Sequence, residues 1–295
     1  ATFDILDNRV SACPFLAAEA VAVGRDIALA IAPFCENGKA ARICVRLNHT
    51  KLSLAILDLC GIGANSGSRD IIRSLSRLTP RIGARVLSNA DTIAAAHATV
   101  AHQCGTYDKS AFDVMYSPIE STCPFKSLIE IEDRVKSLCK NHQGEESNRE
   151  KSGRSAVAAL KMLHKMCEAL YVLGFFEPED TSDIGLKFSW RSTLPRSQRL
   201  CRIILDLGLC DRHGVFSSGL IFDVSMYSSE DSINSKIRKR LLNRGVETRV
   251  VEGGQYDDIL SAYQPPLSGS GPVVGIGVRV PVDVLCRKVA FQDLS

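Results

Sequence analysis

The most restrictive feature of this 295-residue chain is where its strand-like and helix-like patterns lie. The alternation of apolar and polar residues that is typical of half-buried strands occurs in residues 1–62 and again in 200–295. Between them, in 63–199, the apolar spacing is mostly helical. We therefore expect an α+β core made from the first and last of these segments, interrupted by a helical insertion.

The same patterns predict individual elements. Pro14 is placed to start a first long helix and Pro33 to stop it, and Gly61 stands where a second helix would end. Strands are predicted near 3–5, 41–50, 205–210, 219–227, 246–251 and 272–280, and helices near 14–34, 51–60, 68–78, 90–101, 127–139, 156–173 and 282–291. The segment 140–155 lacks aliphatic and aromatic residues, so we expect it to be a mobile loop.

Bulk properties exclude several classes of protein. A net charge of +3 is too small to indicate a nucleic-acid partner by itself. There is no signal-peptide pattern, and the apolar stretch 16–34 carries too many charges to span a bilayer, so we expect a cytoplasmic protein with no membrane contact. The first residue is not Met, and we expect the sequence to be a piece of a longer protein.

The cysteines do not indicate a metal or disulfide framework. Eleven cysteines are an odd number without any Cys-x-x-Cys pair, which favours reduced thiols in a cytosolic or nuclear core. The spacing of His97, His102 and Cys104 fits no familiar zinc pattern. We predict neither a metal nor a cofactor.

Local catalytic signatures are also missing. No Ser-His-Asp, Cys-His or phosphate-loop pattern can be assembled, and "GIGVRV" at 275–280 lacks the third glycine of a dinucleotide loop.

Two basic clusters are candidate RNA contacts, because each phosphate that a cation neutralises adds sequence-independent affinity. One is a ladder on a single helix face and the other is a denser group; their members are Arg69, Arg73 and Arg77, and Lys236, Arg238, Lys239, Arg240 and Arg244. The alternative for both is an ordinary solvated helix face.

The stretch "VVEGGQYDDIL" at 250–260 runs an apolar strand into two adjacent glycines. Glycine loses the most backbone freedom on folding, so a pair of them indicates a tight bend or a close approach. We interpret Gly253 and Gly254 as a turn between a strand and a helix, anchored by Tyr256 and Asp257.

Several stretches, in the same order along the chain, resemble histidyl-tRNA synthetases. "FDIL", "LAAEA" and "VRLNHTKLSLAILDLCGI" resemble segments that follow motif two of that family, and "FSSGLIFDV" resembles the end of its histidine-specific signature. "VVEGGQYDDIL" resembles its GGRYD turn, which lines the active site, and "GIGVRVPVDVL" resembles its motif three. The resemblance implies a class II aminoacyl-tRNA synthetase-like antiparallel sheet with flanking helices. Motif one and the core of motif two are absent, so the core would be incomplete at the N-terminus.

Positions that match the family's histidine site have changed. The arginine that begins the family's signature falls on Arg212 when counted back without a gap from Gly219, but on Asp211 when the preceding strand is aligned instead. The paired tyrosines of the histidine pocket correspond to Phe216 and Ser217. A pocket without these polar donors selects a substrate imidazole poorly.

Positions that match the family's ATP site have changed as well. Val284 stands where motif three has the arginine that binds the triphosphate, and Gln255 replaces the arginine of the glycine turn. Valine offers no donor to a phosphate. By this resemblance the chain is a synthetase-like domain without synthetase activity.

This combination is similar to the synthetase-like domain of the general-control kinases of amino-acid starvation. The resemblance implies binding of uncharged tRNA, formation of a homodimer and activation of a linked serine/threonine kinase domain that phosphorylates the alpha subunit of translation initiation factor two. The ribosome is a further candidate partner. Two alternatives stay open: a working histidyl-tRNA synthetase fragment, and the synthetase-like regulatory subunit of ATP phosphoribosyltransferase.

Overall fold

The computed structural model describes residues 2–7, 12–35, 42–63, 66–78, 89–116, 123–140, 146–175, 201–210, 216, 219–227, 248–257, 260, 274–282 and 286. The strands are β1 (Thr2–Asp7), β2 (Arg42–His49), β3 (Cys201–Leu205), β4 (Leu220–Tyr227), β5 (Thr248–Gln255) and β6 (Val274–Arg279). The helices are α1 (Cys13–Cys35), α2 (Thr50–Leu59), α3 (Ser66–Leu78), α4 (Asn89–Cys104), α5 (Lys109–Tyr116), α6 (Pro124–Lys140) and α7 (Glu146–Val172).

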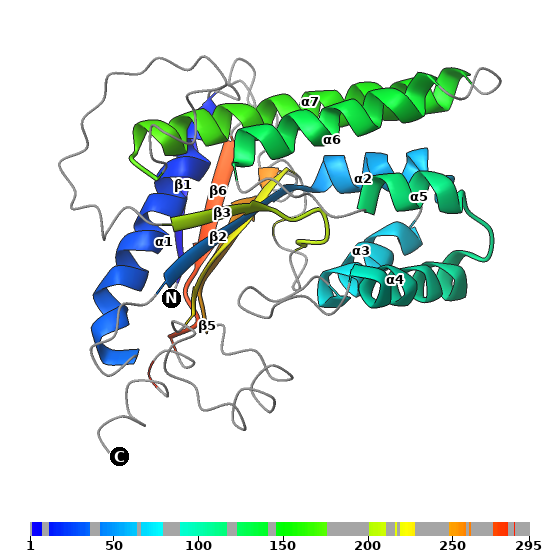
Figure 1. Ribbon diagram of the computed structural model, residues 1–295. Helices are drawn as coiled ribbons and strands as arrows, with labels where there is room; N and C mark the ends of the chain where they lie inside the picture. Colours follow the sequence, from blue (N-terminus) through cyan, green and yellow to red (C-terminus); the bar gives the residue numbers. More distant parts are fainter. Residues whose placement is uncertain are drawn as a thin grey trace, which may run out of the picture.

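The described strands form one mixed sheet in the order β1-β6-β5-β4-β2-β3. It joins the two ends of the sequence, since β1 pairs with β6 and β2 pairs with both β3 and β4 (Figure 1). The predicted α+β class is confirmed. The sheet is not wholly antiparallel as predicted, because β2 and β3 run parallel.

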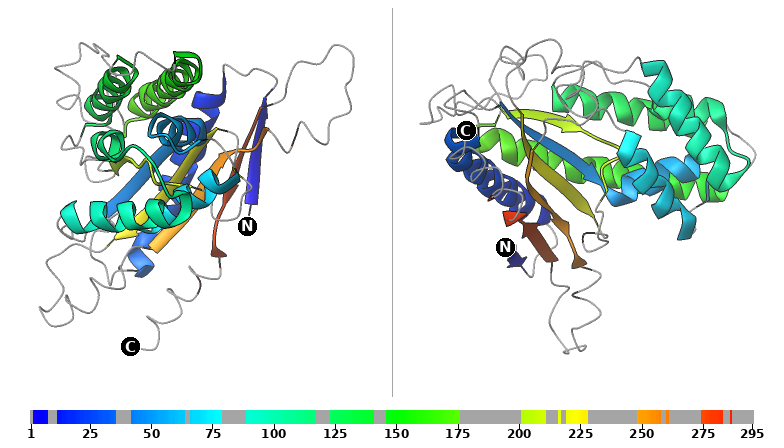
Figure 2. Two further views of the ribbon diagram at one scale, coloured as in Figure 1. Left: turned by 90° about the vertical axis from the view of Figure 1, so that its right-hand side faces the viewer. Right: turned by 90° about the horizontal axis from the view of Figure 1, so that it is seen from below.

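Helix α1 covers one face of the sheet at close range (Figure 2). A Cβ atom on Gly24 would lie 2.9 Å from Val224 Cγ2 and 3.3 Å from Val251 Cβ, so the helix backbone packs directly on β4 and β5. Because successive side chains of a strand alternate between faces, Asp223 and Glu252 point to the opposite face. That opposite face carries the candidate site.

The segment predicted as a helical insertion shares the hydrophobic core of the sheet. Helix α7 packs against α1, α2 and α6, and the α6–α7 pair also contacts β2 and β3 (Figures 1 and 2). Buried side chains of α1, α6, α7 and the sheet belong to one contiguous cluster. Because the helices and the sheet share this core, packing alone does not separate them into domains. The division into 1–62, 63–199 and 200–295 stays a prediction.

The predicted mobile loop at 140–155 is wrong for most of its length. Residues 146–155 belong to α7, and Lys140 belongs to α6; 141–145 lie outside the described residues. Ser152 Oγ hydrogen-bonds to Asp58 of α2, and a Cβ on Gly153 would lie 2.6 Å from Cys139 Sγ. Contacts with α2 and α6 thus stabilise the helical conformation of a polar segment that has no apolar periodicity of its own.

Two further expectations need correction. The strand predicted at 205–210 ends at Leu205, and a turn follows in which Leu209 N donates to Asp206 O at 2.9 Å. Asp206 Oδ1 also accepts from Gly208 N at 2.9 Å, so the carboxylate stabilises the turn. Helix α5 was not predicted, although Asp108 Oδ1 accepts from Ala111 N at 2.9 Å as a helix N-cap does.

The ends of α2 agree with the sequence. His49 is its N-cap, and its Nδ1 accepts from Lys51 N at 3.2 Å. Gly61 follows the helix with a φ of 77°, the left-handed conformation expected of a glycine after the last turn. In the part of the chain that is described, no helix is long and apolar enough to cross a membrane.

Candidate functional site

The adjacent glycines Gly253 and Gly254 lie inside β5 and not in a turn. Gly253 pairs with Phe222 of β4 and Val278 of β6, and Gly254 pairs with Ile221 and Gly277. The interpretation of these glycines as a strand-to-helix turn is therefore wrong. The strand continues through them because β4 and β6 supply backbone partners on both sides.

The two glycines are explained by the close approach of neighbouring atoms, and not by a turn. A Cβ on Gly253 would lie 2.5 Å from Phe222 Cζ and 2.6 Å from Gly277 O. On the opposite face, a Cβ on Gly254 would lie 2.6 Å from Leu220 O and 2.8 Å from Phe216 Cβ. Neither position has room for a side chain.

The face away from α1 carries a patch without side chains, which we call the glycine floor: Gly254, Gly275 and Gly277. Gly254 and Gly277 are direct partners, and Gly275 is two residues along β6, so all three share this face. Such a floor can receive a planar ligand against the backbone.

Two aromatic rings of the chain itself fill the glycine floor. A Cβ on Gly277 would lie 2.7 Å from Phe216 Cε1 and 3.1 Å from Tyr256 Cε1. A Cβ on Gly275 would lie 2.6 Å from Tyr256 Cζ. Phe216 is only 7% exposed and clusters with Leu209, Ile221 and Tyr256.

Polar contacts fix the residues at the end of β5 and just after it, where Tyr256 lies. Asp257 Oδ1 accepts from Gly275 N at 2.9 Å, while its other oxygen accepts from Gln255 Nε2. Tyr256 N donates to Gly275 O at 3.1 Å. Burial, together with the Asp4 carboxylate, raises the pKa of the Tyr256 phenol to about 12, so this hydroxyl stays protonated at neutral pH.

Gln255 occupies the space beside Gly219. Its Oε1 accepts from Leu220 N at 3.3 Å, and a Cβ on Gly219 would lie 1.7 Å from that same oxygen. Gly219 O accepts from Thr50 N at 2.8 Å and from Thr50 Oγ1 at 3.2 Å, which ties this corner to the start of α2. Both functional groups of Gln255 are thus engaged within the chain.

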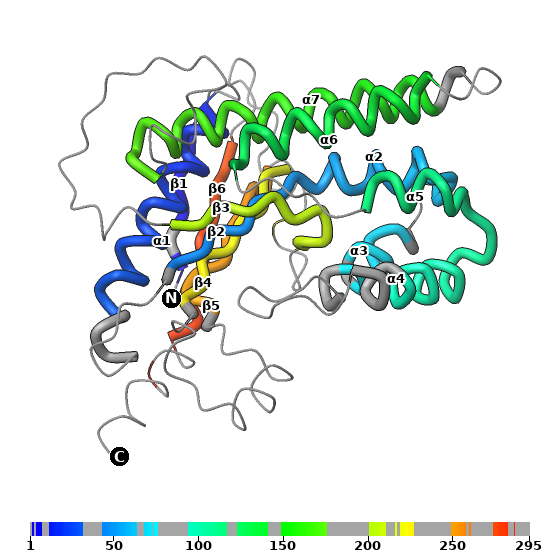
Figure 3. Tube along the Cα trace, viewed as in Figure 1, coloured from blue at the N-terminus to red at the C-terminus, as the bar shows by residue number. Residues whose placement is uncertain are grey.

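A row of charged side chains crosses four neighbouring strands on the same face, and we call it the charged row: Arg46, Asp223, Glu252 and Arg279. Consecutive members are direct partners, from β2 through β4 and β5 to β6. These strands are neighbours in the sheet in that order, and Figure 3 labels all four. Glu252 and Arg279 stand two residues from the glycine floor, so the row borders it.

The arginines of this face are neutralised by carboxylates. Arg46 donates to both oxygens of Asp223 at 2.9 and 2.5 Å and lies 3.5 Å from Asp206. Arg249 Nη2 lies 3.3 Å from Asp223, and its Nη1 donates to Glu252 at 2.8 Å. Arg279 Nε donates to the other Glu252 oxygen at 2.5 Å. Each of these cations therefore contacts an acid, which leaves little excess positive charge for a polyphosphate.

The charged row was not predicted from the sequence. A signal was nevertheless present: Arg46, Asp223 and Glu252 are charged residues inside strands that also carry apolar residues. Charges at such positions are almost always paired, but sequence alone does not identify the partner.

The predicted site residues are described only in part. Arg69 is exposed on α3. Arg73 and Arg77 lie on the same helix, but their side chains are outside the described part of the structure. Also outside it are Arg212, Ser217, Lys236, Arg238, Lys239, Arg240, Arg244 and Val284.

Three other side chains of types that often take part in catalysis are hydrogen-bonded within the chain or protonated. Both ring nitrogens of His97 have protein partners, with Nδ1 2.5 Å from Tyr107 Oη and Nε2 2.6 Å from Asp113 Oδ1. Burial raises the pKa of the Cys13 and Cys60 thiols to about 12, so neither is a thiolate nucleophile at neutral pH.

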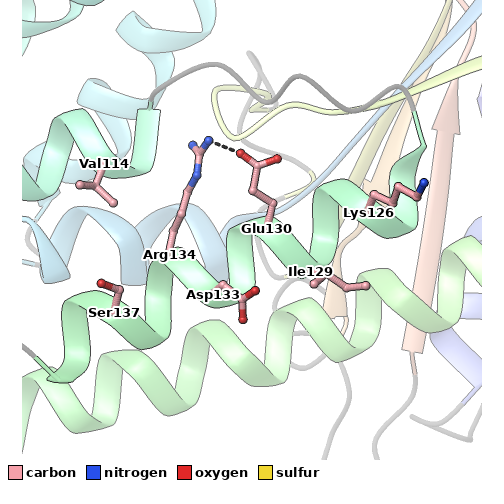
Figure 4. Close-up of a pocket in the computed structure, with 7 residues that line it drawn as sticks. All are labelled: Val114, Lys126, Ile129, Glu130, Asp133, Arg134 and Ser137. Atoms are coloured by element: carbon pink, nitrogen blue, oxygen red, sulfur yellow. Dashed lines mark hydrogen bonds and ion pairs between the residues drawn. The ribbon is translucent and has the colours of Figure 1, made fainter. Parts of the chain in front are cut away.

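A hollow of about 490 Å³ is lined by residues of α5 and α6 and by none of the glycine floor (Figure 4). Within it, Arg134 pairs with Glu130 and donates to Met115 O at 3.4 Å. It is lined by Val114, Lys126, Ile129, Glu130, Asp133, Arg134 and Ser137.

Comparisons with known proteins rest on structure alone. The sequence matches no protein-family model and no curated protein. The structure is similar to a histidyl-tRNA synthetase from Nostoc sp. PCC 7120, with a TM-score of 0.55 and 11% identity over 100% of this chain and 51% of that one. The chain therefore spans about half the length of that synthetase.

Two further structures give weaker matches. One is a histidine–tRNA ligase subunit from Alicyclobacillus acidocaldarius subsp. acidocaldarius DSM 446, with a TM-score of 0.48 and 16% identity over 85% of this chain and 55% of that one. The other is an ATP phosphoribosyltransferase regulatory subunit/histidyl-tRNA synthetase from Bacillus halodurans C, with a TM-score of 0.43 and 13% identity over 98% and 52%. The α+β sheet with its flanking helices is that of a histidyl-tRNA synthetase-like fold.

Proposed function

We propose that this chain is a catalytically inactive histidyl-tRNA synthetase-like regulatory domain. It binds uncharged tRNA during amino-acid starvation and activates a linked serine/threonine kinase domain, which phosphorylates the alpha subunit of translation initiation factor two and represses translation. It works as a homodimer in the cytoplasm.

The observation that carries the proposal is the filled glycine floor. A synthetase must hold an amino acid and ATP together while the adenylate forms. Here the backbone that lacks side chains is covered by Phe216 and Tyr256, and their rings already contact Gly275 and Gly277. The glycines are kept because the rings need the space. The presence of these glycines is therefore compatible with a chain that has lost synthetase activity.

The charged row supports the same conclusion. ATP activation requires cations that are available to the phosphates of the nucleotide. Arg46 has both ends of its guanidinium on carboxylates, and Arg279 is bonded to Glu252. Displacing the buried Arg46–Asp223 pair for a nucleotide would leave an uncompensated charge behind.

Two assays on the 295-residue chain test the proposal. We expect no histidine-dependent exchange between ATP and pyrophosphate, with a working histidyl-tRNA synthetase as the positive control. We also expect the chain to bind deacylated tRNA. Exchange above background would show that the chain is a working synthetase fragment. Binding of free histidine without binding of tRNA would favour the regulatory subunit of ATP phosphoribosyltransferase.

A further inference from the structure

Helix α7 presents a straight row of cations to solvent, which we call the α7 basic row: Lys151, Arg154, Lys161 and Lys165. All four residues are exposed. At about 100° per residue they fall within about 80° of the helix circumference, and the row is about 21 Å long. The opposite side of the helix is buried against other elements, through Ala156, Leu160, Leu163 and Leu170 among others.

The charge of the row is largely uncompensated. Within the described part of the chain, Lys151, Lys161 and Lys165 make no ion pair, and Arg154 reaches only the exposed Glu150 at 3.6 Å. Glu168 borders the row and lies 3.5 Å from His164 Nε2. Exposed pairs of this kind contribute little and are readily exchanged for another partner.

The neighbouring helix α6 differs in this respect, although it is also lysine-rich. Its exposed Lys126, Lys136 and Lys140 are interspersed with acidic residues, and Lys136 Nζ lies 2.8 Å from Glu132. The two helices lie side by side (Figure 2). Helix α7 therefore has a basic surface, and the adjacent helix α6 has a surface of mixed charge.

We propose that the α7 basic row binds the phosphate backbone of the RNA. The row is then a third candidate RNA contact, in addition to the two basic clusters predicted from the sequence. This inference rests on the proposed function, since it concerns where the tRNA binds. A rigid row of lysines without an aromatic side chain suits phosphates of a duplex, not the bases of a single strand. The contact is therefore independent of sequence and sensitive to salt.

The test compares two triple variants that remove equal charge. One replaces Lys151, Lys161 and Lys165 by Gln on α7; the control replaces Lys126, Lys136 and Lys140 by Gln on α6. Binding of deacylated tRNA is measured between 50 and 200 mM salt. Each phosphate contact steepens the negative slope of log affinity against log salt by about 0.7 to 0.9, so the slope of the α7 variant should be shallower than that of the wild type by between about two and three.

The control variant should keep the wild-type slope and bind within about twofold of the wild-type affinity, and the α7 variant should bind at least roughly tenfold more weakly. An α7 variant with Lys→Arg at the same three positions keeps the charge and should bind as the wild type does. Equal losses of tRNA affinity in the α6 and α7 variants, or no loss in the α7 variant, would show that α7 is not the contact surface, although the domain still binds tRNA. A wild-type chain that binds no tRNA would overturn the proposed function together with it.

Discussion

Arg46 and Asp223 form a two-pronged ion pair across β2 and β4, with nitrogen–oxygen distances of 2.9 and 2.5 Å. Arg46 is 7% exposed and Asp223 is 1% exposed, so the pair is enclosed by the molecule. It joins a strand from the first fifty residues to one that follows the whole helical segment. This pair is the buried end of the charged row.

Removing one partner of this pair should destabilise the fold strongly. We expect Asp223→Asn to lower the free energy of unfolding by about 3 kcal/mol, because Arg46 and Arg249 then lose a shared buried carboxylate. Urea unfolding measures this loss. Glu132→Gln on the exposed Lys136 pair is the control and should leave the urea midpoint close to that of the wild type. Similar losses in both variants would contradict the central role of the Arg46–Asp223 pair.

The filled glycine floor predicts an overpacking effect. Gly277→Ala places a methyl group 2.7 Å from the ring of Phe216 and should cost about 1–3 kcal/mol of unfolding free energy. Gly63→Ala is the matched control, since nothing lies within 4 Å of the added carbon. In a double-mutant cycle, Phe216→Ala should relieve part of the cost of Gly277→Ala. Additive losses would mean that the ring does not occupy this space.

His49 should make stability depend on pH. Burial, and then the charge of Lys51, lowers the pKa of His49 from 6.5 to about 4. Between these values the unfolded chain binds a proton that the folded chain does not, so the free energy of unfolding falls as the pH falls from 6.5 to 4. The full effect is about 3 kcal/mol.

His49→Asn should remove this dependence while keeping a good N-cap for α2. The measurement is urea unfolding at several pH values between 4 and 7. His164→Asn, at a partly exposed position of α7, controls for the loss of an imidazole. If the wild type and His49→Asn lose stability in parallel on acidification, His49 is not the group responsible.

The start of α7 can be tested through its contact with α6. Gly153→Ala places a methyl group 2.6 Å from Cys139 Sγ, and we expect a loss of about 1–3 kcal/mol in thermal or urea unfolding. Cys139→Ala removes the sulfur and should restore much of this loss in the double variant. If residues 146–155 were a mobile loop, Gly153→Ala would have almost no effect.

The larger elements were predictable because their patterns are local. Helix α1 has Pro14 in its first turn and Pro33 in its last, although it runs two residues past Pro33 instead of stopping there. Helix α2 has a glycine after its last turn, and β2 and β4 alternate in polarity. The start of α7 was missed because its first turns lack an apolar stripe. Helix α5 was missed because it is short, although Asp108 is a good N-cap signal.

Residue identity by itself predicted the α+β class and marked a pair of glycines as a tight bend or a close approach. Whether those glycines form a turn or a strand depends on partners that are distant in sequence, and only the tertiary structure decided it: β4 and β6 hold Gly253 and Gly254 in the sheet. The occupation of the glycine floor is decided in the same way, because Phe216 reaches Gly277 across more than sixty residues of chain. Periodicity reports which face of an element is buried, whereas contact across strands depends on register.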